Sequence, residues 1–175
     1  MPMRPTSVRV TAAGPSAWVP LNTYATSIAI LLGVVFSSNK NLTVDVEYSS
    51  DQLVPQDCKI TRSTTTATLT LTNHGLSVGD SIVVSQAGAP LDGTYAVASV
   101  TNQNVITYTV ANSGVTTTQG KNAQVIPLRI SDHPVLSALT ANADSNFSVP
   151  PSVVRLTCTA FTAGYADLNI RSGSK

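Results

Sequence analysis

Short runs of alternating apolar and polar residues dominate the middle of the chain, from Thr64 to Tyr108. Ala67, Leu69 and Leu71 alternate with threonines there. Successive side chains of a β-strand point to opposite faces, so this period of two predicts a half-buried strand. Turn residues rich in Gly, Asn and Asp separate it from three further predicted strands, at 81–85, 94–100 and 105–110. Four or five strands with such tight turns predict a small β-barrel or β-sandwich.

Alternation returns on both sides of this block. Leu42 to Tyr48 places apolar residues on one face and polar residues on the other, which predicts a hairpin partner for the apolar run at 27–36. That run is about half of the ~20 residues that a membrane-spanning helix needs, so we expect a strand covered on both faces. In the last third, 153–161 and 165–170 predict a closing hairpin, and 135–146 reads as a loop with one helical turn. Eight flanking strands are expected, around residues 8–12, 17–20, 27–36, 42–49, 127–130, 147–149, 153–161 and 165–170.

A polar link containing proline, Asp51 to Cys58, separates the first flank from the central block. We therefore predict an all-β protein with two domains. Residues 1–57 and 127–175 would form one discontinuous, jelly-roll-like β-sandwich, and 58–126 a small inserted β-barrel or sandwich. Either flank alone would leave an apolar sheet face exposed, so the two flanks should fold together.

Composition supports this interpretation and excludes several classes of function. Hydrophobic residues are 42% and charged residues only 11% of the chain, whereas disordered chains are poor in apolar residues and rich in charge. Glu47 is the one glutamate, so typical helix-surface residues are scarce. The net charge of +1 comes from scattered basic residues, so neither nucleic acid nor a membrane is an expected partner.

The N-terminus lacks the apolar segment of a secretory signal. We therefore expect Cys58 and Cys158 to be buried thiols in a reducing compartment, with a disulfide as the minor alternative. For the same reason the glycosylation sequons at Asn41 and Asn146 are discounted.

Few residues carry the chemistry of a catalytic or metal site. Asp132-His133 could join a serine in a Ser-His-Asp triad, but the nucleophile motif G-x-S-x-G is missing. Asp45 and Glu47 share the polar face of one predicted strand, where we expect them to be solvated. Metal sites need clustered His, Cys, Asp or Glu ligands, and the sequence offers no usable spacing. We therefore predict a protein that is not an enzyme, with no catalytic, cofactor-binding or metal-ligating residue and no cofactor.

Two further features are interpreted as structural. Trp18, the only tryptophan, follows a Gly-Pro turn and is expected to anchor the core. The connection from Asn73 to Asp80 contains two glycines that permit positive φ at its corners. The glycines are Gly75 and Gly79. His74 and Asp80 are expected to hydrogen-bond to the local backbone, and Leu76 and Val78 to cap a small core.

The same connection carries a family resemblance. The central block resembles a β-module common in the virion and tail proteins of tailed bacteriophages, through four motifs: Thr68-Leu69-Thr70-Leu71, His74-Gly75-Leu76, Gly79-Asp80-Ser81-Ile82 and Leu91-Asp92-Gly93-Thr94-Tyr95. In that family the module is accessory, so the resemblance implies a phage structural context and no catalytic residue.

The flanks resemble the two halves of small phage virion proteins. The matching segments are Gly14 to Leu21, Val44 to Ser49, Asp132-His133-Pro134, Leu139-Thr140-Ala141 and Pro151 to Leu156. In those proteins a short loop containing proline joins the halves, whereas here the threonine-rich block occupies that place.

These resemblances imply a virion structural protein on the capsid exterior, assembled in the host cytoplasm. The expected function is capsid decoration or cementing, in which a homotrimer bridges neighbouring subunits of the major capsid protein. Low charge suits a permanent interface, because interface cores are depleted of charged residues. Two alternatives stay open: a neck, tail or tail-fibre structural module, and a carbohydrate- or host-surface-binding module that acts through the insert.

Overall fold

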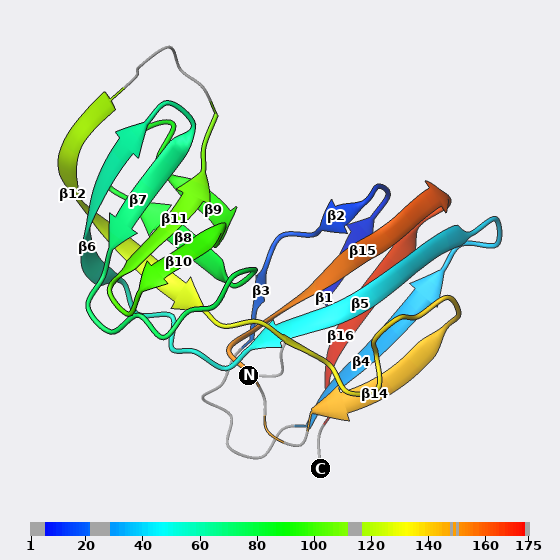
Figure 1. The fold of residues 1–175 in the computed structure, drawn as a ribbon. Helices are drawn as coiled ribbons and strands as arrows, with labels where there is room; N and C mark the ends of the chain where they lie inside the picture. Colours follow the sequence, from blue (N-terminus) through cyan, green and yellow to red (C-terminus); the bar gives the residue numbers. More distant parts are fainter. Residues whose placement is uncertain (1–5, 22–28, 112–116, 148, 150, 174–175) are drawn as a thin grey trace. The chain divides into compact units, whose positions relative to one another are not determined.

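The computed structural model describes residues 6–21, 29–111, 117–147, 149 and 151–173, and these residues form strands and turns without a helix (Figure 1). The all-β prediction is therefore confirmed. The chain divides into two compact units, one made of residues 1–50 and 131–175 and the other of residues 51–130. Each has its own cluster of buried apolar side chains.

The first unit is a sandwich of two antiparallel sheets. One has the strand order β1-β16-β4-β14 and the other β13-β5-β15-β2, with β3 also paired to β15. The chain crosses between the sheets at almost every step, and this strand order is that of a jelly roll. The strands are β1 (Thr6–Val10), β2 (Gly14–Pro15), β3 (Val19–Pro20), β4 (Ala29–Phe36), β5 (Asn41–Ser49), β13 (Ser131–Asp132), β14 (Ala143–Phe147), β15 (Val153–Ala163) and β16 (Ala166–Gly173).

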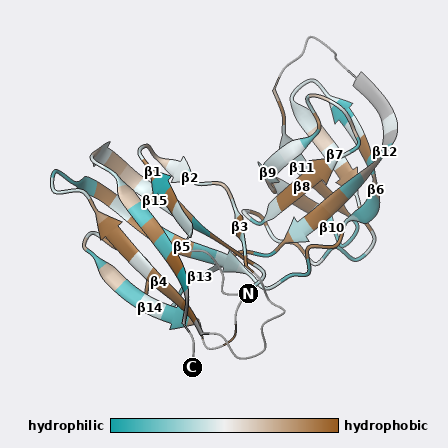
Figure 2. Ribbon diagram, turned by 180° about the vertical axis from the view of Figure 1, so that it is seen from behind, coloured by the Kyte–Doolittle hydropathy of each residue, from teal (hydrophilic) through white to brown (hydrophobic). Residues whose placement is uncertain are grey.

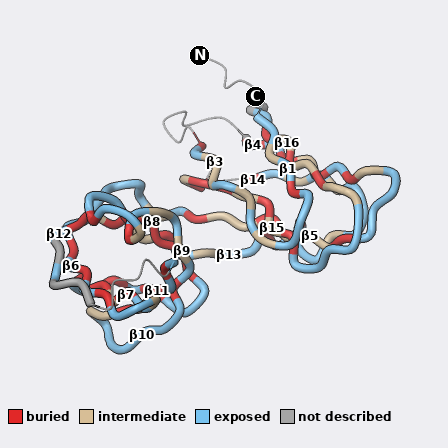
Figure 3. The backbone as a smooth tube through the Cα atoms, turned by 90° about the horizontal axis from the view of Figure 1, so that it is seen from above, coloured by how far each residue is buried: buried red, intermediate tan, exposed pale blue. Residues whose placement is uncertain are grey.

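Alternation along these strands builds the core between the two sheets. Leu32 and Val34 of β4 and Val46 and Leu156 of the opposite sheet are all buried in one cluster. Hydrophobic and hydrophilic residues alternate along the strands in Figure 2, and Figure 3 shows the buried residues concentrated on the strands. The period of two read from the sequence therefore corresponds to the inner and outer faces of each sheet.

Both predicted flanking hairpins are wrong. β4 and β5 lie in different sheets, as do β15 and β16. β5 pairs with β15, and β16 pairs with β4. Alternation shows which face of a strand is buried but not which strand lies beside it. The turn after β4 and the turn between β15 and β16 bind each other instead. Ser37 N donates to the Tyr165 carbonyl oxygen at 3.0 Å, and Tyr165 N donates to Ser37 Oγ at 3.0 Å.

Several predicted strand positions also need correction. The strand expected at 127–130 is the end of a longer strand of the second unit, and β13 follows it. β14 lies in the segment interpreted as a loop with a helical turn, and it replaces the strand expected at 147–149. It is an edge strand whose side chains are mostly polar, so the hydrophobic signal was weak. In β4, Leu31 and Val35 are each 43% exposed, so only one face of this strand is covered.

The second unit is one antiparallel sheet that closes on itself. Its strand order is β10-β11-β7-β6-β12-β8-β9. The first and last strands of this order are successive parts of one segment, Gly93 to Asn102, which pairs with β8 and then with β11. Tyr108, Ile60 and Ile82 lie inside the resulting small barrel. The strands are β6 (Gln56–Ser63), β7 (Thr66–Thr70), β8 (Ser81–Ser85), β9 (Gly93–Ala96), β10 (Ser99–Asn102), β11 (Val105–Thr109) and β12 (Thr117–Leu128).

The limits of the second unit lie outside the insert expected at 58–126. Residues 51–57 and 127–130, expected in the flanking sandwich, belong to the second unit. β6 begins at Gln56 inside the segment interpreted as a link, because it pairs with β12. β12 continues to Leu128 because its second half pairs with β8. The polar, proline-containing residues of 51–57 gave no strand pattern, and the strand pattern at 127–130 could not show that its partner is β8.

Candidate functional site

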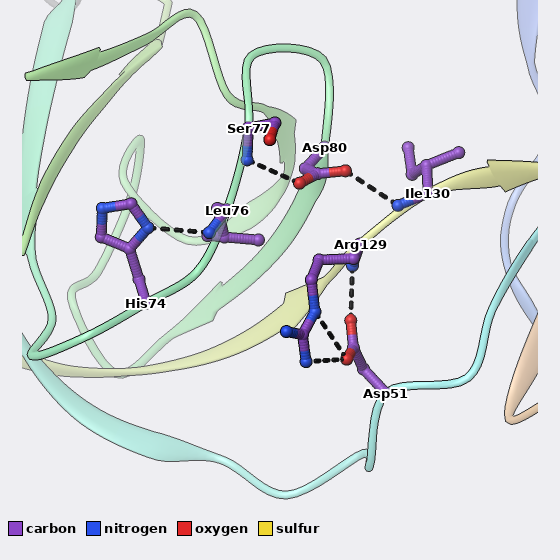
Figure 4. Close-up of polar contacts among 7 residues, drawn as sticks. All are labelled: Asp51, His74, Leu76, Ser77, Asp80, Arg129 and Ile130. Carbon is purple, nitrogen blue, oxygen red and sulfur yellow. Dashed lines mark hydrogen bonds and ion pairs between the residues drawn. The ribbon is translucent and has the colours of Figure 1, made fainter. Parts of the chain in front are cut away.

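His74 begins the turn between β7 and β8 and is buried (Figure 4). Its Nδ1 accepts a hydrogen bond from Leu76 N at 2.9 Å, and its Nε2 lies 2.9 Å from the carbonyl oxygen of Asn102. Because a carbonyl only accepts, Nε2 carries the proton. Both ring nitrogens therefore bind main chain, and the imidazole fastens the turn to β10.

Asp80 ends the same turn and binds two main-chain groups. Its Oδ2 accepts from Ser77 N at 2.7 Å, and its Oδ1 accepts from Ile130 N at 2.8 Å, where the chain leaves the unit (Figure 4). Asp80 therefore ties the turn to the C-terminal end of the second unit.

The two glycines of this turn have positive φ, +62° at Gly75 and +93° at Gly79, as the sequence predicted. Leu76 is buried in the barrel core. The prediction that Val78 also caps the core is wrong, because this side chain is 66% exposed. Val78 lies at the tip of the turn, between Ser77 and Gly79. Ser77 N binds the Asp80 carboxylate, and Gly79 N binds the Val97 carbonyl oxygen.

The first and last segments of the second unit are joined by an ion pair. Asp51 accepts from Arg129 N at 2.5 Å and from Arg129 Nε at 2.9 Å, and Arg129 Nη2 also binds this carboxylate (Figure 4). Hydrogen bonding to Asp51 raises the pKa of the Arg129 guanidinium. Asp51, Asp80 and Arg129 together form what we call the base clamp, because they hold the entering and leaving chain segments against the barrel.

His133 in the first unit repeats the arrangement of His74. Its Nδ1 lies 3.2 Å from both Val135 N and Leu136 N, and its Nε2 lies 3.4 Å from the carbonyl oxygen of Asn146. The ring also packs edge-on against Phe147, with centroids 4.8 Å apart. These main-chain partners occupy the ring nitrogens, so neither histidine is placed to activate a serine.

The carboxylates of β5, expected to be solvated, both have partners in the fold, although Asp45 stays partly exposed. Asp45 Oδ1 accepts from Ser137 Oγ at 2.9 Å and from Ala138 N at 2.5 Å. Glu47 Oε2 binds Arg155 Nε of the neighbouring strand at 2.6 Å. Their partners lie about 90 and 108 positions away in sequence, so spacing could not reveal them.

The prediction that Trp18 anchors the core is wrong. Its ring lies 4.3 Å from the guanidinium carbon of Arg155, on the outer face of the sheet that contains β5 and β15. The next residue, Val19, packs against the core instead. Val19 is partly buried and begins β3, and Trp18 directly before it lies on the other side of the chain.

The two cysteines are unpaired and buried, one in each unit. Burial raises the pKa of the Cys58 thiol to about 11 and also raises that of Cys158. Both residues therefore stay protonated at neutral pH, which is the behaviour of inert core thiols. The sequence prediction of buried thiols agrees with this placement.

Among the described residues, no group of three or more His, Cys, Asp or Glu side chains could hold a metal ion. No helix long and apolar enough to cross a membrane occurs in the described part of the chain.

An open pocket of about 520 Å³ lies on the second unit. We call it the amide pocket, because amide, hydroxyl and charged side chains of β6, β7 and β12 and the residue after β8 line it. Sequence reasoning missed it, since polar residues on a strand carry no motif. Its principal polar residues are Asp57, Lys59, Thr70, Gln86, Asn122 and Gln124.

Comparison with known proteins adds little to this geometry. No family model matches the chain, and no curated protein matches it. A solved structure, the phage phi92 endosialidase, is similar at 32% sequence identity over 46% of this chain, with a TM-score of 0.37. The match covers 15% of the endosialidase chain, and a TM-score of this size does not show a shared fold.

Proposed function

We propose that this protein is a structural component of a tailed-phage particle and that it decorates the capsid exterior. The observation that carries the proposal is a jelly-roll body interrupted between β5 and β13 by a closed barrel module. The motifs of both parts resemble phage virion proteins. The histidines and carboxylates that could serve catalysis instead bind main chain or form ion pairs within the fold.

The mechanism in this proposal is binding without turnover. The jelly roll bridges neighbouring subunits of the major capsid protein, and a homotrimer multiplies weak contacts into high avidity. The barrel is then an accessory domain carried by the jelly roll. Assembly takes place in the host cytoplasm, where the buried thiols of Cys58 and Cys158 remain reduced.

The outer face of β4 is the contact surface that we assign to the shell. Leu31 and Val35 are both 43% exposed there, and Gly33 between them leaves a pocket of about 290 Å³. Asp144 and Arg171 also line this pocket, and the Asp144 carboxylate lies over Gly33. Protein interfaces combine exposed apolar side chains with polar groups, and this face of β4 offers both.

Binding of the purified protein to empty, expanded shells of its phage tests this assignment. We expect Leu31→Gln to weaken shell binding at least tenfold, because it places a polar amide at an apolar contact. Leu53 of the second unit, 41% exposed, gives the matched control, and Leu53→Gln should bind like the wild type. Equal binding by both variants and wild type would exclude the β4 face, and absence of wild-type binding would refute capsid decoration.

A neck or tail component is the second candidate. The motifs of the inserted barrel resemble a module found in tail proteins as well as in other virion proteins, and this resemblance supports the neck or tail candidate. Such a component would also be a structural protein, but few copies would occupy each particle. Binding to isolated tails, with no binding to shells, would support this candidate.

A further inference from the structure

The amide pocket is built by side chains from neighbouring strands of the barrel. Lys59 of β6 is paired in register with Thr70 of β7 and with Asn122 of β12. Asp57 of β6 is likewise opposite Gln124. These side chains are therefore neighbours on one surface of a rigid sheet, and Figure 1 shows the strands side by side.

Among the residues that line the pocket, Gln86 has an unusual backbone conformation. Its φ is +67°, a left-handed conformation that residues other than glycine rarely adopt. Two neighbouring bonds hold it, because Asp92 accepts from Ala87 N at 2.8 Å and from Gly88 N at 3.0 Å. Backbone strain that the surroundings enforce is concentrated at functional sites. Here it directs the Gln86 amide into the pocket.

A row of planar polar groups crosses the pocket. Gln86 Nε2 donates to Gln124 Oε1 at 2.7 Å, and Gln124 Nε2 lies 3.4 Å from Asp57 Oδ1. These contacts orient the amides before any ligand arrives. Amides offer both donors and acceptors, and carboxylates offer acceptors, to which hydroxyl groups can hydrogen-bond.

We propose that the amide pocket binds a neutral oligosaccharide segment. Lys59 and Asp57 contribute one charge of each sign, so the pocket selects no charged ligand. The hydroxyl and amide groups match the hydroxyls of a sugar. This inference does not rest on capsid decoration, since it concerns the second unit alone.

An extended peptide is a poorer fit to the amide pocket. Peptides add to an exposed sheet edge or place alternate side chains in apolar pockets. The segment from Gly93 to Asn102 closes the sheet of the barrel, and most of the residues that line the pocket have polar or charged side chains. An aromatic platform is missing from the lining, so each site should bind weakly.

The test uses the full chain on an array of immobilised bacterial surface oligosaccharides, followed by titration with a soluble fragment of the responding glycan. Binding should perturb the amide NMR signals of Gln86 and Gln124. Gln86→Gly removes the amide and also relieves the positive φ, so affinity should fall about tenfold while the unfolding midpoint stays equal or rises. Gln103, an exposed glutamine outside the pocket, gives the control, and Gln103→Ala should bind normally.

Three outcomes would overturn the proposal. The first is an array without signal, and the second is a signal that Gln86→Gly leaves unchanged. The third is stronger binding to immobilised peptides than to glycans, which would assign the pocket to a protein partner.

Discussion

Replacing Asp80 with alanine should destabilise the barrel while leaving the jelly roll intact. The carboxylate is buried and accepts hydrogen bonds from Ser77 N and Ile130 N. A buried donor left without a partner costs about 1–3 kcal/mol. The two donors together would therefore lose about 2–6 kcal/mol, and because both bonds are only partly buried, water should recover some of this cost. We expect a loss of about 2–4 kcal/mol in the free energy of unfolding of the second unit.

The two units can be followed separately in the full chain. Trp18, the only tryptophan, reports unfolding of the first unit by fluorescence. Hydrogen exchange of peptides from β8 and β12 reports the second unit. In Asp80→Ala, exchange of these peptides should accelerate by the factor that corresponds to the lost free energy, whereas the tryptophan transition should not move.

Asp144, an exposed carboxylate of β14, provides the control, since Asp144→Ala should change neither readout. Asp80→Asn keeps one acceptor and should lie between the wild type and the alanine variant. A change below about 0.5 kcal/mol in Asp80→Ala would refute the role of Asp80 in the base clamp, because surface substitutions give changes of that size.

Two further predictions concern alkaline pH and the sandwich corner. The pKa of Cys58 is about 11 in the folded protein against an ordinary 9.0, so its contribution is present below pH 9 and is lost as the pH rises toward 11. The loss in the free energy of unfolding of the second unit should be at most about 2.7 kcal/mol, read from the shift of its denaturation midpoint with pH, and Cys58→Ala should remove this part of the pH dependence. Gly164→Ala should destabilise the first unit by about 2–4 kcal/mol, because φ is +95° and the added Cβ would lie 2.6 Å from Ser37 Oγ. Chemical denaturation followed by Trp18 fluorescence measures this loss, and an unchanged midpoint would contradict the corner geometry.

The base clamp gives a physical account of how one domain interrupts another. Asp51 and Arg129 bind each other where the chain enters and leaves the second unit. Because the two ends are adjacent, the jelly roll closes the connection between β5 and β13 at little more cost than a short loop. Loop-closure entropy depends on the distance between the ends and only weakly on the number of inserted residues.

Local pattern predicted much of this fold. Alternation at Leu42 to Tyr48 and at Ala67 to Leu71 correctly indicated strands with one buried face. The role of His74 and Asp80 followed in part from local turn chemistry, since each side chain has one partner within three residues and a second one far away in sequence. The predicted features depend on contacts that neighbouring residues make.

Long-range pairing could not be predicted in the same way. The partner of Glu47 is Arg155, and the same arginine stacks on the Trp18 ring. The amide pocket depends on register between β6 and β12 and on the positive φ of Gln86. Neither a register nor a strained φ has a signature in one sequence.

The number of copies in purified phage particles tests the central claim most directly. Quantitative mass spectrometry of intact particles gives the ratio of this chain to the major capsid protein. A decoration protein that bridges shell subunits should be present at a ratio near one, or at a fixed simple fraction of it. A handful of copies per particle would contradict capsid decoration and place the protein at the neck or tail.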